Sequence, residues 1–316
     1  MKIVTELVAS KSVAPAFVLL GVFWGAFAAY VPEIKQIIQA SDAAFGTAML
    51  IAAIGAVMAM WLAPKIDTLL PRYAIVVLML LGCGLYFIPT HATSLLVFTL
   101  GMLFMSSISG TLDVVMNARL SQIETEKSMS LMGLNHAVFS FGYAFAALIA
   151  GMCRGQGVSF GQFAIGVMCL ALVLTLLAGP SKSVEDDAEP EAKDVKVTFK
   201  LVLIPGLIIM IAFMTEQATE AWSALHIERV LEVSAELSAL GPAILGITMG
   251  LGRLAGHYGM KSRSERGVVA VGALVTAFGA LLAAWSNVSV GVYAGFALLG
   301  AGVSVMVPMI FSYVSK

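Results

Sequence analysis

The chain has 316 residues, of which 59% are hydrophobic and only 12% are charged. Soluble domains carry about 25% charged residues, so this composition excludes a soluble globular protein and indicates a polytopic membrane protein. The net charge of −1 and the lack of a basic stripe in the sequence argue against a nucleic-acid partner. Three cysteines, Cys83, Cys153 and Cys169, have neither paired nor metal-type spacing, so no metal or cofactor is expected.

Ten apolar stretches are long enough to cross a membrane, which takes roughly 20 residues each. They are expected near 13–32, 44–63, 73–91, 94–117, 131–152, 159–179, 202–223, 237–256, 267–285 and 288–312. With the amino terminus inside, 15 of the 18 Lys and Arg residues fall on the cytoplasmic side. This bias predicts cytoplasmic amino and carboxyl termini.

A charged segment, 181–200, separates the first six spans from the last four. It holds six acids and four lysines, a composition that predicts a solvated cytoplasmic linker. The expected domains are therefore a six-helix bundle over 1–180, the linker, and a partial bundle of four helices over 201–316.

A weak internal repeat relates the two parts of the chain at an offset of 190 residues. The shift pairs Phe23 with Phe213 and Asp67 with His257, and it superposes spans 1 to 4 on spans 7 to 10. Continued further, it predicts two more spans near 321–369, beyond Lys316. We therefore expect a C-terminally shortened bundle that is open on one flank.

Few ionisable residues lie within the expected spans, and each is a candidate for function because burying a charge in a membrane is costly. Asp113 and Asn117 are four residues apart in span 4 and share a helix face. Asn135 and His136 begin span 5 at a similar depth. A carboxyl group in a low-dielectric cavity can take up and release a proton as the cavity opens to either side. Asp113 is thus the first candidate for proton coupling, and a structural hydrogen bond, for example to His136, is the alternative.

Span 7 contributes the other acids. Glu216 and Glu220 lie on one helix face with Trp222 close by, and Glu216 is the second candidate for proton coupling. Trp24 in span 1 and Trp222 could form a stacking surface for a sugar-like or ring-bearing solute. Rings at helical spacing also serve as packing residues and interface anchors, so both interpretations stay open.

Several of these motifs together resemble the major facilitator superfamily, and in particular the YbjJ- and MosC-like branch, which is similar to fucose permeases. The resemblance lies in Trp24-Gly25, Leu112–Asn117, Asn135-His136, Glu216 with Ala221–Leu225, and Gly252–Gly256. It implies two six-helix bundles around a central cavity and transport by alternating access. It also implies that Asp113 matches the position of a proton-coupling acid in span 4. The acid that fucose permeases carry in span 1 is missing here.

The same resemblance implies a cytoplasmic gate in the loop between spans 2 and 3, where Asp67 and Arg72 match the superfamily signature. The second copy of this signature keeps Arg253 but has His257 in place of the acid. Arg253 is therefore expected at the gate, bonded to helix-end carbonyls or to a nearby acid.

The sequence as a whole predicts a monomeric secondary transporter of a small polar organic solute, sugar-like solutes included, coupled to protons. One alternative is a ten-helix drug/metabolite-type exporter, whose five-plus-five repeat would lack the long linker. Another is a membrane sensor or scaffold that does not transport. An enzyme is not expected, because no nucleophile–base pair or phosphate-binding loop is present.

Overall fold

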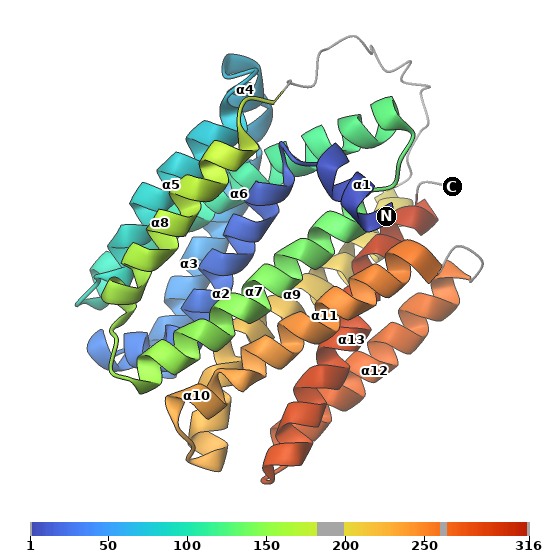
Figure 1. Cartoon of the computed structure of the whole chain (residues 1–316). Coiled ribbons are helices and arrows are strands. Elements are labelled where there is room, and N and C mark those ends of the chain that lie inside the picture. Colours follow the sequence, from blue (N-terminus) through green and yellow to red (C-terminus); the bar gives the residue numbers. More distant parts are fainter. Residues whose placement is uncertain (1, 182–198, 260–263, 315–316) are drawn as a thin grey trace.

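The computed structural model describes residues 2–181, 199–259 and 264–314, and every regular element in these ranges is an α-helix (Figure 1). The helices are α1 (Lys2–Ala9), α2 (Ala14–Ile37), α3 (Asp42–Met60), α4 (Ala63–Leu69), α5 (Ala74–Thr90), α6 (Leu95–Lys127), α7 (Met132–Gly155), α8 (Phe160–Ala178), α9 (Phe199–Leu231), α10 (Ala235–Ser238), α11 (Leu240–Gly259), α12 (Glu265–Trp285) and α13 (Ser289–Val314).

Nine of the spans expected from the sequence coincide with helices that are long and apolar enough to cross a membrane, counted within the described residues. The remaining one, 73–91, coincides with α5, which has 17 residues and follows α4 with a bend of 117°. If this bent pair is one span, the described residues contain ten. The expectation of an all-α polytopic protein is confirmed.

Two helices run well past the ends that hydropathy predicts. The apolar part of α6 ends near Asn117, but the helix continues to Lys127 and stops at Ser128, which adopts the left-handed conformation. Helix α9 likewise continues to Leu231. The extra turns carry polar residues that favour a helix as much as apolar ones do. Hydropathy therefore locates the part of each helix in the apolar layer, but not the whole helix.

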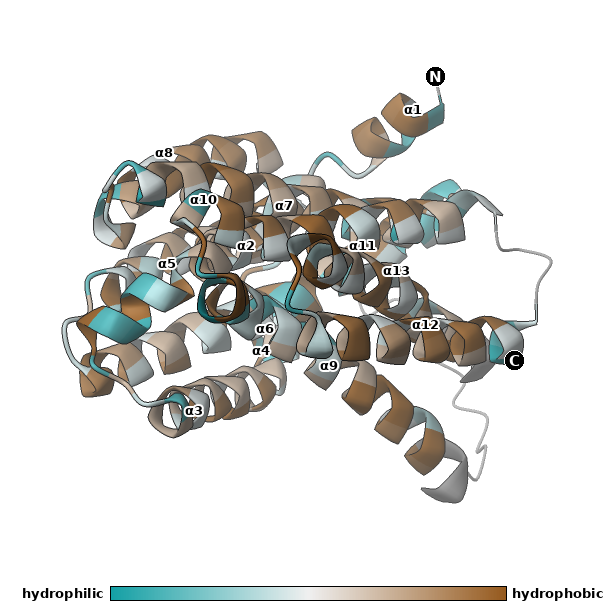
Figure 2. Ribbon diagram, turned by 90° about the horizontal axis from the view of Figure 1, so that it is seen from below, coloured by the Kyte–Doolittle hydropathy of each residue, from teal (hydrophilic) through white to brown (hydrophobic). Residues whose placement is uncertain are grey.

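Helix α2 is the centre of the packing, with 83% of its most apolar window buried. It lies against α7 and α8 and also against α9, while α7 packs along α11. Segments before residue 182 therefore contact segments after residue 198 directly. By contrast, the corresponding windows of α9 and α12 are only 17% and 22% buried. Figure 2 shows that α9 and α12 consist largely of hydrophobic residues, which suits contact with lipid.

Helices α2 and α7 approach each other closely in this core. A Cβ atom added to Gly21 would lie 2.2 Å from the carbonyl oxygen of Phe139, and one added to Gly25 would lie 2.0 Å from that of Tyr143. Small residues at this spacing let two helix backbones touch. The pairing of α2 with α7 therefore depends on these two glycines.

The helix order repeats as the offset of 190 residues predicts. Helix α5 begins at Ala74 and α12 at Glu265, and α6 begins at Leu95 and α13 at Ser289. Most of the expected linker, 182–198, lies outside the described residues, so its solvated character stays a prediction. The domain boundaries and the cytoplasmic side of the termini also stay predictions.

We expect Gly25→Ala to lower the melting temperature of the purified protein in detergent, because the new methyl group collides with the α7 backbone. Overpacking of this kind costs about 1–3 kcal/mol. The matched control is Gly166→Ala in the middle of α8, where an added Cβ meets nothing within 4 Å. This control should leave the melting temperature unchanged or raise it, because Ala favours a helix over Gly. Equal melting temperatures for the two variants would contradict the proposed role of Gly25.

Candidate functional site

The interior of the helix bundle contains an ion pair between Arg253 of α11 and Glu216 of α9. The Arg253 Nη2 atom donates to Glu216 Oε1 at 2.9 Å, and the two side chains are only 11% and 8% exposed. The Nη1 atom donates to Ser140 Oγ of α7 at 2.5 Å and to the carbonyl oxygen of His136 at 3.4 Å. One guanidinium group therefore joins three helices, two of them from the part of the chain after residue 198.

The polar chain continues from His136 toward α6. The Nε2 atom of His136 lies 3.2 Å from the amide oxygen of Asn117, and the Asn117 amide nitrogen donates to Asp113 Oδ1 at 3.1 Å. Because the amide oxygen of Asn117 can only accept, the imidazole carries its proton on Nε2 in this arrangement. The hydrogen bond that the sequence suggested between Asp113 and His136 thus runs through Asn117.

Five residues singled out from the sequence therefore lie in one continuous network over α6, α7, α11 and α9. They are Asp113, Asn117, His136, Arg253 and Glu216. Arg253 is bonded to a nearby acid, which was one of the two arrangements expected for it. Its partners place it in the interior of the bundle.

Asn135 and Glu220 lie outside these bonds. The fully buried Asn135 donates to the Leu131 carbonyl oxygen of its own helix. Its Oδ1 atom is buried without a hydrogen-bond partner in the described part of the chain. Glu220 is 6% exposed, lies one turn from Glu216 on α9, and accepts a long hydrogen bond of 3.4 Å from Gln217.

Each of the two tryptophans packs against a phenylalanine ring, and the expected stacking surface for a solute stays a prediction. Trp24 packs edge-on against Phe27, with 5.9 Å between ring centroids. Trp222 packs edge-on against Phe45, and the Lys35 ammonium lies 5.1 Å from the Trp222 ring centroid. Trp222 is therefore engaged in packing and in a cation–π contact.

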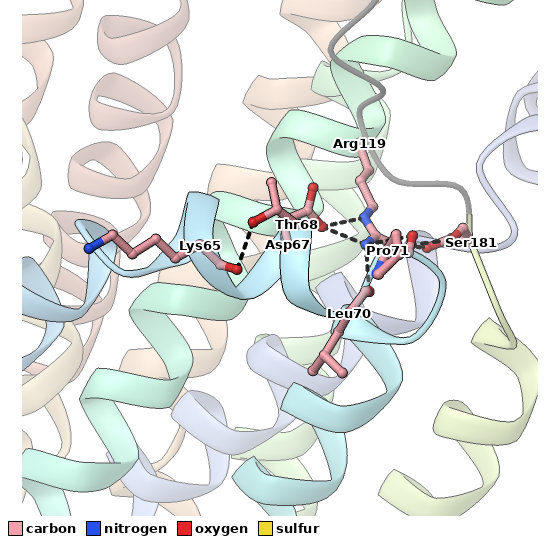
Figure 3. A network of polar contacts seen from close by, with 7 residues as sticks. All are labelled: Lys65, Asp67, Thr68, Leu70, Pro71, Arg119 and Ser181. Carbon is pink, nitrogen blue, oxygen red and sulfur yellow. Dashed lines mark hydrogen bonds and ion pairs between the residues drawn. The ribbon is translucent and has the colours of Figure 1, made fainter.

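Arg119 holds the expected gate loop, although in the sequence it is only one of the basic residues expected on the cytoplasmic side. Arg119 of α6 is 1% exposed and donates to Asp67 Oδ1 from Nε at 2.9 Å and from Nη2 at 2.5 Å (Figure 3). It also donates to the carbonyl oxygen of Pro71 at 3.3 Å and to Ser181. The side chain of Arg72 is exposed, and this residue contributes its carbonyl oxygen, which accepts from the Ser181 amide.

A second group of ion pairs lies at the opposite end of the molecule, near α10 in Figure 1. Arg154 at the end of α7 pairs with Glu228 of α9. Arg229 of α9 pairs with Asp42 of α3 at 2.8 Å, and Lys35 of α2 pairs with the same carboxylate. We call these five residues the α10-end cluster. Sequence patterns did not indicate it, because charges at the ends of spans ordinarily face water.

Comparison with known proteins gives a consistent result. The family model described as the Major Facilitator Superfamily matches residues 13–316. The chain is 26% identical over 306 residues to an uncharacterised MFS-type transporter of Yersinia pestis, covering 94% of this chain and 78% of that protein. It is also 26% identical over 308 residues to the membrane protein MosC of Rhizobium meliloti, covering 95% of this chain and 74% of that one.

The fold is similar to that of a solved transporter. A crystal structure of the nucleoside transporter NupG, in its D323A mutant form, superposes with a TM-score of 0.74 at 15% identity, over 94% of this chain and 80% of that one. The resemblance stated from the sequence motifs is thus confirmed over nearly the whole chain. This protein belongs to the major facilitator superfamily.

Proposed function

We propose that this protein is a secondary transporter of a small polar organic solute that works by alternating access in a bacterial inner membrane. We further propose that it couples solute movement to protons through Asp113. The observation that carries the proposal is the continuous polar network from Asp113 to Glu216, which joins helices of both expected bundles. A network with this path can transmit a change of charge at one end to the contact between the bundles.

Asp113 is better suited than Glu216 to exchange a proton. The Glu216 carboxylate is neutralised by Arg253, so protonating it would leave a buried guanidinium without its counter-ion. Asp113 is half-buried, and the ion pairs of the described residues do not include it; its hydrogen-bond partner is the neutral amide of Asn117. A proton on Asp113 therefore breaks no ion pair.

The coupling step follows from the hydrogen bonds of Asn117. An ionised Asp113 accepts from the Asn117 amide nitrogen, which leaves the amide oxygen to accept from His136. A protonated Asp113 becomes a donor and favours the opposite orientation of the amide, which gives up the bond of its nitrogen to the Asp113 carbonyl oxygen and then faces His136 with that nitrogen. This change weakens the bond to His136, whose carbonyl oxygen accepts from Arg253. The protonation state of Asp113 can thereby bias the contact between α7 and α11.

The solute class is proposed from the site and from the relatives together. NupG is a nucleoside transporter, and a nucleoside carries both hydroxyl groups and a ring. The half-buried Trp24 and the second acid, Glu220, offer a ring face and a hydrogen-bond acceptor to such a molecule. Membership of the superfamily favours six-helix halves over the five-plus-five exporter. A sensor or scaffold that does not transport is left as the competing function.

Asp113→Asn should uncouple transport from protons. In proteoliposomes with an internal pH-sensitive dye, sugars, polyols and nucleosides are screened for those that drive proton uptake. For an active solute, the variant should lose the proton signal but retain counterflow of the labelled solute, because exchange needs no net proton movement. Glu126→Gln, which changes an exposed acid at the end of the same helix, is the control. A variant that kept its solute-driven proton uptake would exclude Asp113 as the coupling residue, and binding without any counterflow would support the sensor.

Arg253→Gln and Glu216→Gln should each destabilise the purified protein, because each leaves one buried charge unpaired. The expected cost of each single change is about 3–5 kcal/mol, and the double variant should cost clearly less than the sum. Lys65→Gln, an exposed cation on α4, is the control and should leave the melting temperature unchanged. Strict additivity of the two changes would show that the ion pair does not stabilise the protein.

A further inference from the structure

The short helix α1 carries a buried acid. Glu6 is 3% exposed, although its neighbours Ile3, Val4 and Val8 are between 46% and 63% exposed. A carboxylate that is removed from water needs partners to offset its lost hydration. The side of α1 that carries Glu6 is therefore held against another part of the protein by specific contacts.

Those contacts come from the end of α11. The hydroxyl of Tyr258 donates to Glu6 Oε2 at 2.5 Å, and His257 Nε2 lies 3.4 Å from the same oxygen. From α1 itself, the Lys2 ammonium lies 3.9 Å from Glu6 Oε1 and 5.1 Å from the centroid of the Tyr258 ring. The His257 side chain is 2% exposed, so this carboxylate–imidazole contact is shielded from solvent.

The internal repeat relates this contact to the gate loop. The offset of 190 residues pairs Asp67 with His257 and Arg119 with Met309. In the first part of the chain, the acid Asp67 is bonded to the base Arg119 of α6. In the second part, the residue equivalent to Arg119 is the apolar Met309, and the residue equivalent to Asp67 is His257. The polarity of the pair is thus reversed, and the acid that completes it comes from α1.

Helix α1 is joined to the first part of the chain. It leads into α2, and the Lys127 ammonium at the end of α6 donates to the carbonyl oxygen of Ala9 at 3.0 Å. Its bonds to His257 and Tyr258 therefore connect the first part of the chain to α11. Figure 1 shows that they lie at the end of the molecule that also carries α4, away from α10.

We propose that α1 is a latch between the two halves of the protein, with Glu6 as the residue that binds His257 and Tyr258. The latch joins the halves at this end in the present conformation and must release when the halves separate here. The contact itself does not depend on which solute is carried or on whether protons are coupled. If the proposed transport function proved wrong, the contact of Glu6 with His257 and Tyr258 would not be affected. If the contact proved wrong, the proposed transport function would not be affected either.

The test measures the position of α1 directly. In a variant with Cys83, Cys153 and Cys169 replaced by Ala, spin labels are placed at two exposed positions, Val8→Cys on α1 and Val271→Cys on α12. Electron–electron resonance on the purified chain in lipid nanodiscs then gives the distribution of label distances. A second label pair, Val57→Cys with Val271→Cys, reports on the separation of α3 and α12 without α1.

Glu6→Ala should broaden the Val8–Val271 distribution, with the docked population falling about tenfold relative to the undocked one, because a charged hydrogen bond is lost. Tyr258→Phe, a milder change, should shift it in the same direction. Glu126→Ala removes an exposed acid and should leave the distribution unchanged. If only α1 is released, the Val57–Val271 distances stay the same. If the whole half moves, they change as well.

A charge exchange completes the test. His257→Glu places two acids together and should release α1, and the double variant Glu6→His with His257→Glu should restore much of the docked population. The proposal is overturned if Glu6→Ala and Tyr258→Phe both match Glu126→Ala, or if the exchanged pair is no better docked than His257→Glu alone.

Discussion

The interior of this protein depends on satisfying one buried guanidinium group. Arg253 lies among apolar helices, where an unpaired charge would cost several kcal/mol. It donates hydrogen bonds to Glu216 of α9, to Ser140 of α7 and to the carbonyl oxygen of His136. These bonds draw α7, α9 and α11 together, and α7 in turn lies against α2 through the glycine contacts. Three of the four helices that carry the candidate site, α7, α9 and α11, are therefore joined by one charge, and α7 is joined to α2 by one close backbone contact.

The ends of the molecule are joined by different interactions. At the end near α10, Arg154 and Arg229 form charge–charge pairs that connect α7 and α3 to α9. At the opposite end, the carboxylate of Glu6 on a short helix links the halves within the part of the chain that the structure describes. Two arginine pairs, one of which shares its aspartate with Lys35, make a larger set of bonds than one carboxylate with a tyrosine and a histidine. Among the described residues, more ion pairs therefore join α9 to the first part of the chain near α10 than join α11 to α1.

The repeat also explains why Asp67 and the equivalent residue His257 have partners in different parts of the chain. In the first part of the chain the acid and its partner, Asp67 and Arg119, are both in the repeated unit, and the pair is closed within one half. In the second part the partner position holds an apolar residue, so the histidine must find its acid elsewhere. A contact within one half stiffens that half, whereas a contact between the halves breaks when they separate.

The sequence by itself determined the all-helical membrane architecture, the placement of the spans, and most residues of the polar network. These are local properties: a span shows as an apolar stretch, and Asp113, Asn117, His136 and Glu216 stand out because polar groups are costly in such stretches. Only the tertiary structure decided the partners. Arg253 bonds Glu216 at a separation of 37 residues, Arg119 bonds Asp67 at 52, and Tyr258 bonds Glu6 at 252. No local pattern encodes such pairs, because helix packing brings them together, and an arginine that will be buried looks in the sequence like one that faces water.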